Sequence, residues 1–233
     1  MPMVQIKNLH KKFTLHAQNG AVLNVLNGID LQVKSGEIAA LCGPSGAGKS
    51  SLLKAIYGTY RINSGDIKIK TVKQNINIAK AAPRDIMLLR RDVIGYVSQF
   101  LRVIPRIGAL GIVAEPAIMQ GMPADQAHKI ALDLLNQLRI PQKLHNLSPL
   151  TFSGGEQQRV NIARAMAAPR PLMLFDEPTA SLDPQNRQTV LELIAQLRDQ
   201  GTAILGIFHD PADRKFLNAR DIQLSAIEEA EHV

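Results

Sequence analysis

A glycine-rich octapeptide constrains this chain more than any other feature of the sequence. Residues 43–50 are Gly-Pro-Ser-Gly-Ala-Gly-Lys-Ser, a glycine, four residues, a second glycine, a lysine and a serine. The glycines let successive backbone N–H groups turn towards a phosphate chain, and a following helix adds the positive end of its dipole. An apolar run at Ile38–Leu41 precedes the loop, and Ser51–Tyr57 favours a helix after it. The pattern therefore predicts a phosphate-binding loop in an α/β fold.

The side chains of this loop carry the expected chemistry. Lys49 is placed to reach the β and γ phosphates of a nucleotide, and the Ser50 hydroxyl can bind Mg²⁺. A glycine-rich turn that carries a lysine by chance is the weaker alternative, because an apolar strand and a helix flank the loop. The predicted nucleotide contacts are Gly43, Pro44, Ser45, Gly46, Ala47, Gly48, Lys49, Ser50 and Ser51.

A pair of acids follows a second apolar run. Residues 172–177 are Leu-Met-Leu-Phe-Asp-Glu, typical of a central strand that delivers carboxylates at its C-terminal edge, where open α/β sheets bind ligands. Asp176 is expected to hold Mg²⁺ through water, and Glu177 to act as general base on an attacking water. Two solvated acids that open a loop are the weaker alternative beside a phosphate loop.

The remaining apolar patterns predict an α/β core with two additions. The run Ala203–Phe208 suits another strand covered on both faces. Alternation within residues 1–37, and again at Ile67 and Ile69, predicts a small antiparallel sheet. Between residues 99 and 168 the apolar period becomes helical. We expect one domain over residues 1–233, with 1–98 and 169–233 as the α/β core with its β subdomain and 99–168 as a helical lobe.

Several helix ends can also be predicted. One helix ends before Pro141, and a second covers residues 156–168. A third covers residues 185–200, with Asp183 as its N-cap and Gly201 after its last turn.

A third motif distinguishes among phosphate-loop proteins. Residues 152–159 are Phe-Ser-Gly-Gly-Glu-Gln-Gln-Arg, a turn that opens a helix and so forms another anion site. The motif resembles the signature of ABC ATP-binding cassettes, usually Leu-Ser-Gly-Gly-Gln before a basic helix, with Phe and Glu in place of Leu and Gln. With the other motifs, the resemblance spans positions 13–209. It implies a RecA-like phosphate-loop NTPase core with an inserted helical lobe, and ATP and Mg²⁺ as cofactors.

The family resemblance implies roles for four further residues. Gln99 matches the glutamine that meets Mg²⁺ and the attacking water, and His209 matches the histidine that contacts the γ-phosphate. Asp183, in Ser-Leu-Asp at 181–183, matches the loop that couples the two sites of a dimer. A loop amide, a strand-end histidine and a helix cap are the respective alternatives. Phe13 is the candidate for stacking on adenine, with core packing as its alternative.

The family also implies a head-to-tail pair of cassettes, either identical or different. Each nucleotide lies between the phosphate loop of one cassette and the signature of the other. Ser153, Gly154 and Gly155 are then expected to contact a nucleotide that the second cassette holds.

The cysteine count, the length of the apolar runs and the charge limit the location and the partners that can be expected for this chain. Cys42 is the only cysteine, so no intrachain disulfide can form and a reducing, cytoplasmic location is expected. The apolar runs are shorter than the roughly 18 residues of a membrane span, so we expect no direct membrane insertion. The net charge is +7, but the basic residues are scattered and lack interleaved aromatics, so no nucleic acid is expected.

Segments outside the motifs shared by ABC cassettes point to a particular group within the family. Residues 96–107 depart from the Leu-x-Pro and Thr-Val pair of transporters, and residues 206–210 are Gly-Ile-Phe-His-Asp instead of ending in Val-Thr-His-Asp. With 152–164 and 15–26, they resemble the L subunits of bacterial phosphonate carbon–phosphorus lyase systems. This implies that ATP turnover supports synthesis of α-D-ribose 1-methylphosphonate 5-triphosphate, with other lyase subunits as partners.

The main alternative is the ATPase subunit of a membrane transporter of the lipoprotein-release or macrolide-export type. The segment from Gln99 to Pro105 discriminates between the two, because in transporters it faces the membrane partner. Which subunit the chain docks on, and what ATP turnover drives, stay open at this point.

Overall fold

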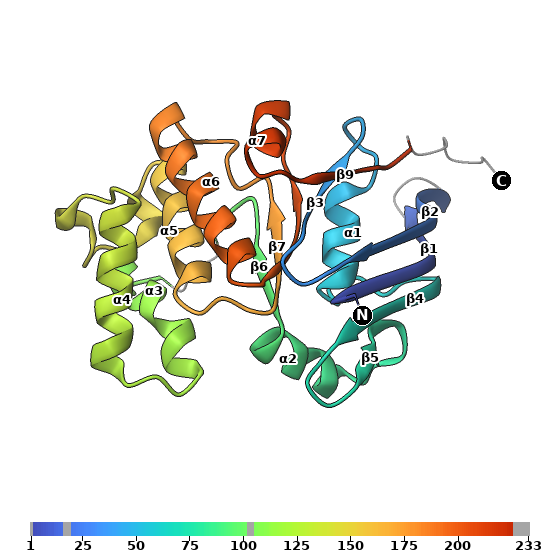
Figure 1. Cartoon of the computed structure of the whole chain (residues 1–233), viewed down its shortest axis with the longest axis horizontal. Coiled ribbons are helices and arrows are strands. Elements are labelled where there is room, and N and C mark those ends of the chain that lie inside the picture. The colour runs from blue at the N-terminus through green and yellow to red at the C-terminus, as the bar shows by residue number, and fades with distance from the viewer. Residues whose placement is uncertain (1, 16–19, 102–104, 226–233) are drawn as a thin grey trace.

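Two sheets and a group of helices organise the chain in the computed structural model, which describes residues 2–15, 20–101 and 105–225 (Figure 1). The larger sheet is parallel throughout. Its strands, in spatial order, are β6 (Ile94–Val97), β7 (Leu172–Asp176), β8 (Ala203–Ile207), β3 (Ile38–Cys42) and β9 (Arg220–Gln223). Phosphate-loop chemistry is expected at the C-terminal edge of such a sheet.

The central strands of this sheet are buried on both faces, as their continuous apolar runs predict. Leu172 and Leu174 of β7 join a core cluster with the N-terminal strands and helix α1 (Lys49–Ile56). Met173 and Phe175 point to the opposite face and join a second cluster with the other helices. The sheet therefore lies between two apolar cores, and each face of its central strands packs against one of them.

The smaller sheet is antiparallel and confirms the prediction of an N-terminal β subdomain. Its spatial order is β2 (Ala21–Val33), β1 (Val4–Leu15), β4 (Ser64–Lys70) and β5 (Asn75–Asn77). Val4 pairs with Val33 on one side and with Ile69 on the other. Because alternate residues face the same way, the apolar positions of three strands meet over α1.

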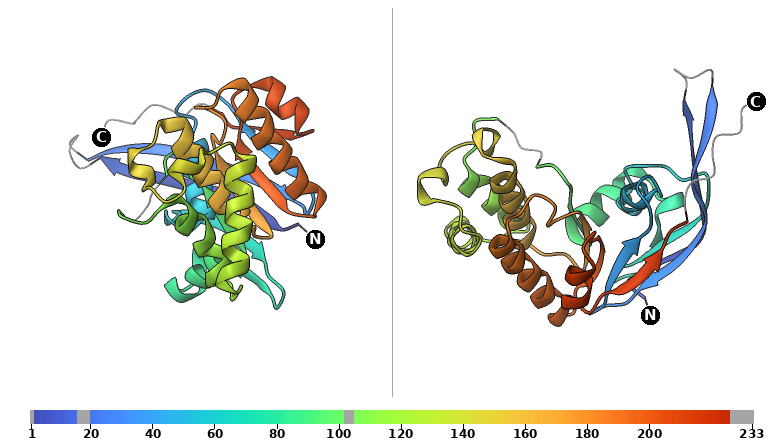
Figure 2. Two further views of the ribbon diagram at one scale, coloured as in Figure 1. Left: turned by 90° about the vertical axis from the view of Figure 1, so that its left-hand side faces the viewer. Right: turned by 90° about the horizontal axis from the view of Figure 1, so that it is seen from above.

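The helical region follows β6. It contains α3 (Ala109–Met119), α4 (Ala124–Gln137) and α5 (Gly154–Met166), and α6 (Pro184–Asp199) packs with them on the same face of the sheet. Viewed from above, this lobe lies at one end of the molecule and the strands β1 and β2 at the other (Figure 2). Within the described ranges, no helix combines the length and apolar character needed to cross a membrane.

Some elements differ from the sequence prediction. Helix α5 begins at Gly154, two residues before the predicted start, because Ser153 caps it. Helix α6 begins at Pro184 with Asp183 as its N-cap, so this predicted cap is confirmed. The helices α2 (Pro83–Asp92) and α7 (Pro211–Phe216) and the edge strand β9 were not predicted. Each is short or strongly charged, so its apolar period is weak.

Candidate functional site

The phosphate loop connects β3 to α1, as predicted. Gly48 is the N-cap of α1 with φ of 81°, and a Cβ atom there would lie 2.6 Å from the carbonyl oxygen of Val25. Only glycine fits both the left-handed backbone and this close approach. Lys49 is 9% exposed, and its ammonium donates to the carbonyl oxygens of Gly43 (2.9 Å) and Pro44 (2.7 Å). The lysine ammonium is therefore held over the phosphate loop, which lies at the N-terminal end of α1.

A cavity of about 380 Å³ opens over this loop. It brings together residues from the β subdomain, the phosphate loop and the ends of β7 and β8. The lining residues are Phe13, Leu23, Val25, Ser45, Gly46, Ala47, Gly48, Lys49, Ser50, Ser51, Glu177 and His209. Segments far apart in the sequence thus meet in one hollow with cationic, hydroxyl and carboxylate groups.

Asp176 lies at the C-terminal end of β7 and is 4% exposed. Its Oδ1 accepts a hydrogen bond from the Ser50 hydroxyl at 2.8 Å, and its Oδ2 accepts one from the Tyr96 hydroxyl at 2.8 Å. Burial, and then the negative charge of Asp176, raise the pKa of Tyr96. The carboxylate is consequently fixed between the phosphate loop and β6.

Glu177, the next residue, has a different setting. Its φ of 54° lies in the left-handed region that non-glycine residues rarely adopt. The Gln99 amide nitrogen donates to Oε2 at 3.1 Å, and Nε2 of His209 lies 2.7 Å from Oε1. The three predicted catalytic side chains thus form one connected group at the edge of the cavity.

The oxygen atoms available here fit a magnesium ion. The described residues hold no group of three or more His, Cys, Asp or Glu side chains that could bind a metal. A cation would instead be held by the Ser50 hydroxyl, the Asp176 carboxylate and the amide oxygen of Gln99, together with phosphate oxygens and water. Mg²⁺ prefers such oxygen ligands and commonly uses one or two carboxylates plus phosphates.

The signature residues lie outside this cavity. Ser153 caps α5 in a capping box: its hydroxyl accepts from the Glu156 N–H at 3.3 Å, and Glu156 accepts from the Ser153 N–H at 2.9 Å. The Ser153 hydroxyl, followed by the Ser153 N–H, lowers the pKa of Glu156. Ser153, Gly154 and Gly155 are not among the described residues that line the cavity over the phosphate loop.

The predicted coupling loop lies against the signature turn. A Cβ atom on Gly155 would lie 2.9 Å from the carbonyl oxygen of Ser181. Asp183 accepts from the N–H groups of Gln185 (3.1 Å) and Asn186 (3.0 Å), which confirms its role as a helix cap. The Asn186 N–H is the first cause of the lowered pKa of Asp183.

Phe13 lies on the cavity wall, where stacking on a base is possible. Its ring makes an edge contact with Tyr60, with centroids 5.2 Å apart, and the Lys11 ammonium lies 4.5 Å from its centroid. Partial packing against the apolar core also occurs, so both predicted roles of Phe13 agree with its position.

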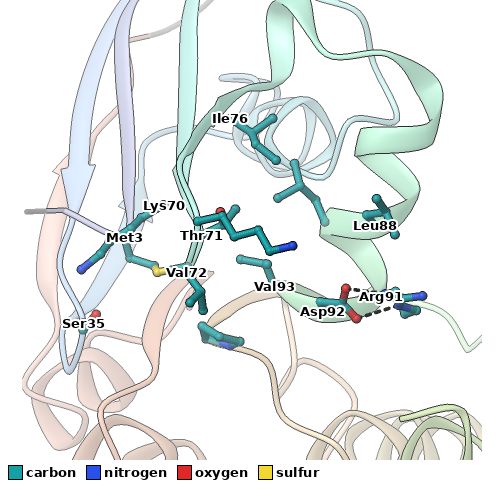
Figure 3. A pocket seen from close by; sticks show the side chains of 13 residues that line it. Met3, Ser35, Lys70, Thr71, Val72, Ile76, Leu88, Arg91, Asp92 and Val93 are labelled. Carbon is teal, nitrogen blue, oxygen red and sulfur yellow. Dashed lines mark hydrogen bonds and ion pairs between the residues drawn. The ribbon is translucent and has the colours of Figure 1, made fainter.

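A larger hollow lies elsewhere, between the β4–β5 turn, α2 and the start of β6 (Figure 3). Its volume is about 500 Å³, and Val72, Ile76 and Leu88 contribute apolar walls. Arg91 and Asp92 form an ion pair at its rim. It lacks the phosphate loop and the carboxylate–histidine group, so the smaller cavity is the candidate site.

Sequence reasoning missed the contribution of Tyr96 and Asn161. Tyr96 reaches Asp176 from the neighbouring strand, and the Asn161 amide donates to the Ser98 carbonyl at 2.7 Å, which ties α5 to the segment before Gln99. Both contacts join residues more than 60 positions apart. The only sequence signal is the position of Tyr96 three residues before Gln99.

The comparisons with known proteins agree with this fold and identify the family. The family model described as "ABC transporter" matches residues 26–180. The lipoprotein-releasing system ATP-binding protein LolD of Novosphingobium aromaticivorans is 38% identical over 90% of this chain and 90% of its own length. The glutamine transport ATP-binding protein GlnQ of Escherichia coli is 36% identical over 89% of this chain and 81% of its own length.

Two further comparisons concern length and fold. The macrolide export ATP-binding/permease protein MacB of Sodalis glossinidius is 32% identical over 97% of this chain, which spans about a third (34%) of that relative. A solved structure titled as the dimeric, post-hydrolysis state of the ATP-binding cassette MJ0796 with ADP and Pi has a TM-score of 0.86 at 31% identity, over 98% of both chains.

Proposed function

The chain belongs to the ABC transporter family, and from this we propose that it is an ATPase subunit that binds and hydrolyses Mg-ATP. One observation carries the proposal: Lys49, Glu177 and His209 line one cavity, whose Ser50 is hydrogen-bonded to Asp176. These groups supply a phosphate-binding cation, a base and a metal ligand within reach of one substrate.

Each residue of the site has its own role in the proposed reaction. The loop N–H groups and Lys49 bind the phosphates, while Ser50, Asp176 and Gln99 would hold Mg²⁺. When bound there, Mg²⁺ would supply positive charge that stabilises the negative charge on the phosphate oxygens. Glu177 accepts a proton from water as the water oxygen bonds to the γ phosphorus and the bond to ADP breaks. His209 orients Glu177 and reaches the γ-phosphate.

The proposed working unit is a head-to-tail pair of cassettes. Ser153, Gly154 and Gly155 lie outside their own cavity, as expected if they contact a nucleotide across an interface. The MJ0796 cassette, which shares this fold, was solved as a dimer with ADP and Pi. We infer that the signature turn, with α5 behind it, provides the second half of each site.

Replacing the base tests the proposed activity. In Glu177→Gln, phosphate release should fall about 10²- to 10⁴-fold, since general-base catalysis contributes that much. ATP affinity, measured by titration calorimetry, should stay unchanged. Glu192→Gln, on the exposed face of α6, controls for loss of a carboxylate. Turnover near the wild-type rate would remove Glu177 as base.

The names of the relatives favour a membrane transporter as the assembly in which this chain works. LolD and GlnQ carry names of transport or release systems, and MacB joins its ATP-binding part to a permease. By analogy, the present chain would work with a membrane permease and drive transport by ATP turnover.

A second candidate rests on the segment after β6. Residues 96–107 resemble phosphonate carbon–phosphorus lyase L subunits, although Arg102, Val103 and Ile104 lie outside the described residues. Phe100, which lies within residues 96–107 and after the end of β6, is 74% exposed. An exposed aromatic suits a protein–protein contact. On this reading the chain supports synthesis of ribose 1-methylphosphonate 5-triphosphate.

Affinity capture from cells grown on a phosphonate as sole phosphorus source separates the two partners. An integral membrane protein recovered with the chain indicates the transporter, and phosphonate-pathway subunits indicate the lyase. Phe100→Asp should release either partner while nucleotide binding persists. Phe216→Asp on α7, which is 46% exposed, is the matched control and should retain the partner. Equal release by both variants would exclude the segment after β6 as the docking surface.

A further inference from the structure

We propose that Tyr96 is a positioning residue for the magnesium site: its hydroxyl holds one oxygen of Asp176 so that the carboxylate presents its other oxygen towards Ser50 and the metal. This inference rests on the proposed Mg-ATP function and adds a residue to which no motif assigns a role in the nucleotide site. Tyr96 is not among the described residues that line the cavity, so it would act through Asp176 and not by touching the nucleotide.

The hydrogen bonds of Asp176 carry the argument. Tyr96 donates to Oδ2 and Ser50 donates to Oδ1, both at 2.8 Å. At 4% exposure, Asp176 has almost no access to water that could replace a lost donor. A carboxylate with a donor on each oxygen has one favoured orientation, whereas one with a single donor can rotate about its side-chain bonds.

The strand register explains how Tyr96 reaches this position. Strands β6 and β7 are parallel, with Tyr96 beside Leu174. The tyrosine is long enough to extend along the edge of the sheet to Asp176, two residues further on. A shorter side chain at the same register would leave Oδ2 without this donor.

The ring of Tyr96 is itself held in place. It stacks on Tyr57, with centroids 5.1 Å apart and an interplanar angle of 28°. The Arg90 guanidinium lies 4.5 Å from the centroid of Tyr57, and its Nε donates to the Tyr57 carbonyl at 2.9 Å. Residues from the end of α1 and from α2 therefore fix the hydroxyl that contacts Asp176. Such outer contacts commonly set metal affinity, and losing one typically weakens binding about tenfold or more.

Tyr57 provides a matched control. Tyr57→Phe removes a hydroxyl from the other ring of the stacked pair, and that hydroxyl makes no hydrogen bond to another residue in the described part of the chain. Both substitutions keep an aromatic ring at each position, so the stack is retained. Of the two substitutions, Tyr96→Phe is the one that removes a hydrogen-bond donor from Asp176.

The experiment measures metal-dependent nucleotide binding without turnover. In the Glu177→Gln background, a fluorescent ATP analogue is titrated with Mg²⁺ against the parent, Tyr96→Phe and Tyr57→Phe, and again in excess chelator. We expect Tyr96→Phe to raise the half-saturating Mg²⁺ concentration about tenfold. Tyr57→Phe should match the parent, and metal-free binding should be equal in all three.

The possible outcomes are distinct. Unchanged or tighter Mg²⁺ dependence in Tyr96→Phe overturns the inference. An equal change in Tyr57→Phe assigns the effect to the stack, and weaker metal-free binding in Tyr96→Phe assigns it to the nucleotide pocket; either also overturns it. If the parent binds no ATP analogue at all, the proposed function fails and this inference with it.

Discussion

At the scale of single residues, two adjacent acids obtain different surroundings from their backbone. Asp176 ends a buried strand and is enclosed by hydroxyl donors. Glu177 begins the next segment with a positive φ and turns towards Gln99 and His209. One residue is thus suited to hold a cation and the other to receive a proton, although their side chains differ by one methylene group.

Lys49 offers a direct test at this scale. Lys49→Ala should weaken binding of a non-hydrolysable ATP analogue about 10- to 100-fold, because hydrogen bonds to charged groups contribute about 1.5–3 kcal/mol. Isothermal titration calorimetry measures the change. Lys54→Ala, also on α1 but outside the residues that line the cavity, should bind like wild type. An unaltered dissociation constant in Lys49→Ala would contradict the phosphate-loop prediction.

The residue scale also shows where sequence reasoning succeeds. The phosphate loop is predictable because its glycines, lysine and serine are contiguous, so their chemistry follows from local backbone geometry. Tyr96 is not predictable in this way, because its partner Asp176 is 80 residues away and their contact depends on strand register. Phe13 lies at the cavity, but its stacking role stays a prediction.

At the scale of elements, the cap of α5 contributes a pH-dependent part of stability. The pKa of Glu156 lies below its ordinary value of 4.5 in the folded chain, first because the Ser153 hydroxyl and then its N–H donate to the carboxylate. A depressed folded pKa gives stability that is present above the unfolded pKa and is lost as pH falls through the folded value.

Glu156→Gln should therefore unfold more easily than wild type at neutral pH, with a difference that shrinks as pH falls below 4.5. Urea unfolding at a series of pH values measures this difference. Glu192→Gln controls for removal of an exposed carboxylate from a helix. A gap that is constant from neutral to acidic pH would show that the capping box adds no pH-dependent stability.

Helix starts were predicted correctly where the capping residue was identified in the sequence, as at α6, whereas the cap Ser153 was not identified and the start of α5 was placed two residues late. Asp183, followed by Pro184, gave the start of α6. Helix α2 escaped prediction because Leu89 is its only buried residue and half of its ten side chains are charged. Strand β9 is four residues long and, within the described ranges, pairs with β3 alone, so its alternation is too brief to detect.

At the scale of the whole molecule, the separation of the signature turn from its own cavity predicts nucleotide-dependent pairing. In Glu177→Gln with Mg-ATP, we expect a dimer by light scattering, and a monomer without nucleotide. Adding Gly154→Asp should abolish the dimer, because a carboxylate would face the phosphates of the second cassette. A Cβ atom on Gly154 meets no heavy atom within 4 Å, so the substitution fits the folded chain.

Titration calorimetry checks that the Gly154→Asp double variant still binds ATP as a monomer. Dimers that persist in this variant would contradict head-to-tail pairing through the signature turn. The same experiment with a candidate second cassette would distinguish identical from different partners, a choice that the sequence alone leaves open.

The left-handed backbone of Glu177 has an energetic consequence for the protein. A non-glycine residue in this region costs about 1–3 kcal/mol, and such strain persists only where the surrounding fold over-determines it. Here β7 fixes the chain before Glu177, and the Thr179 hydroxyl after it donates to Asp213 at 2.9 Å. Glycine at position 177 would relax the backbone but remove the base. Selection for greater thermal stability alone would therefore act against activity at this position.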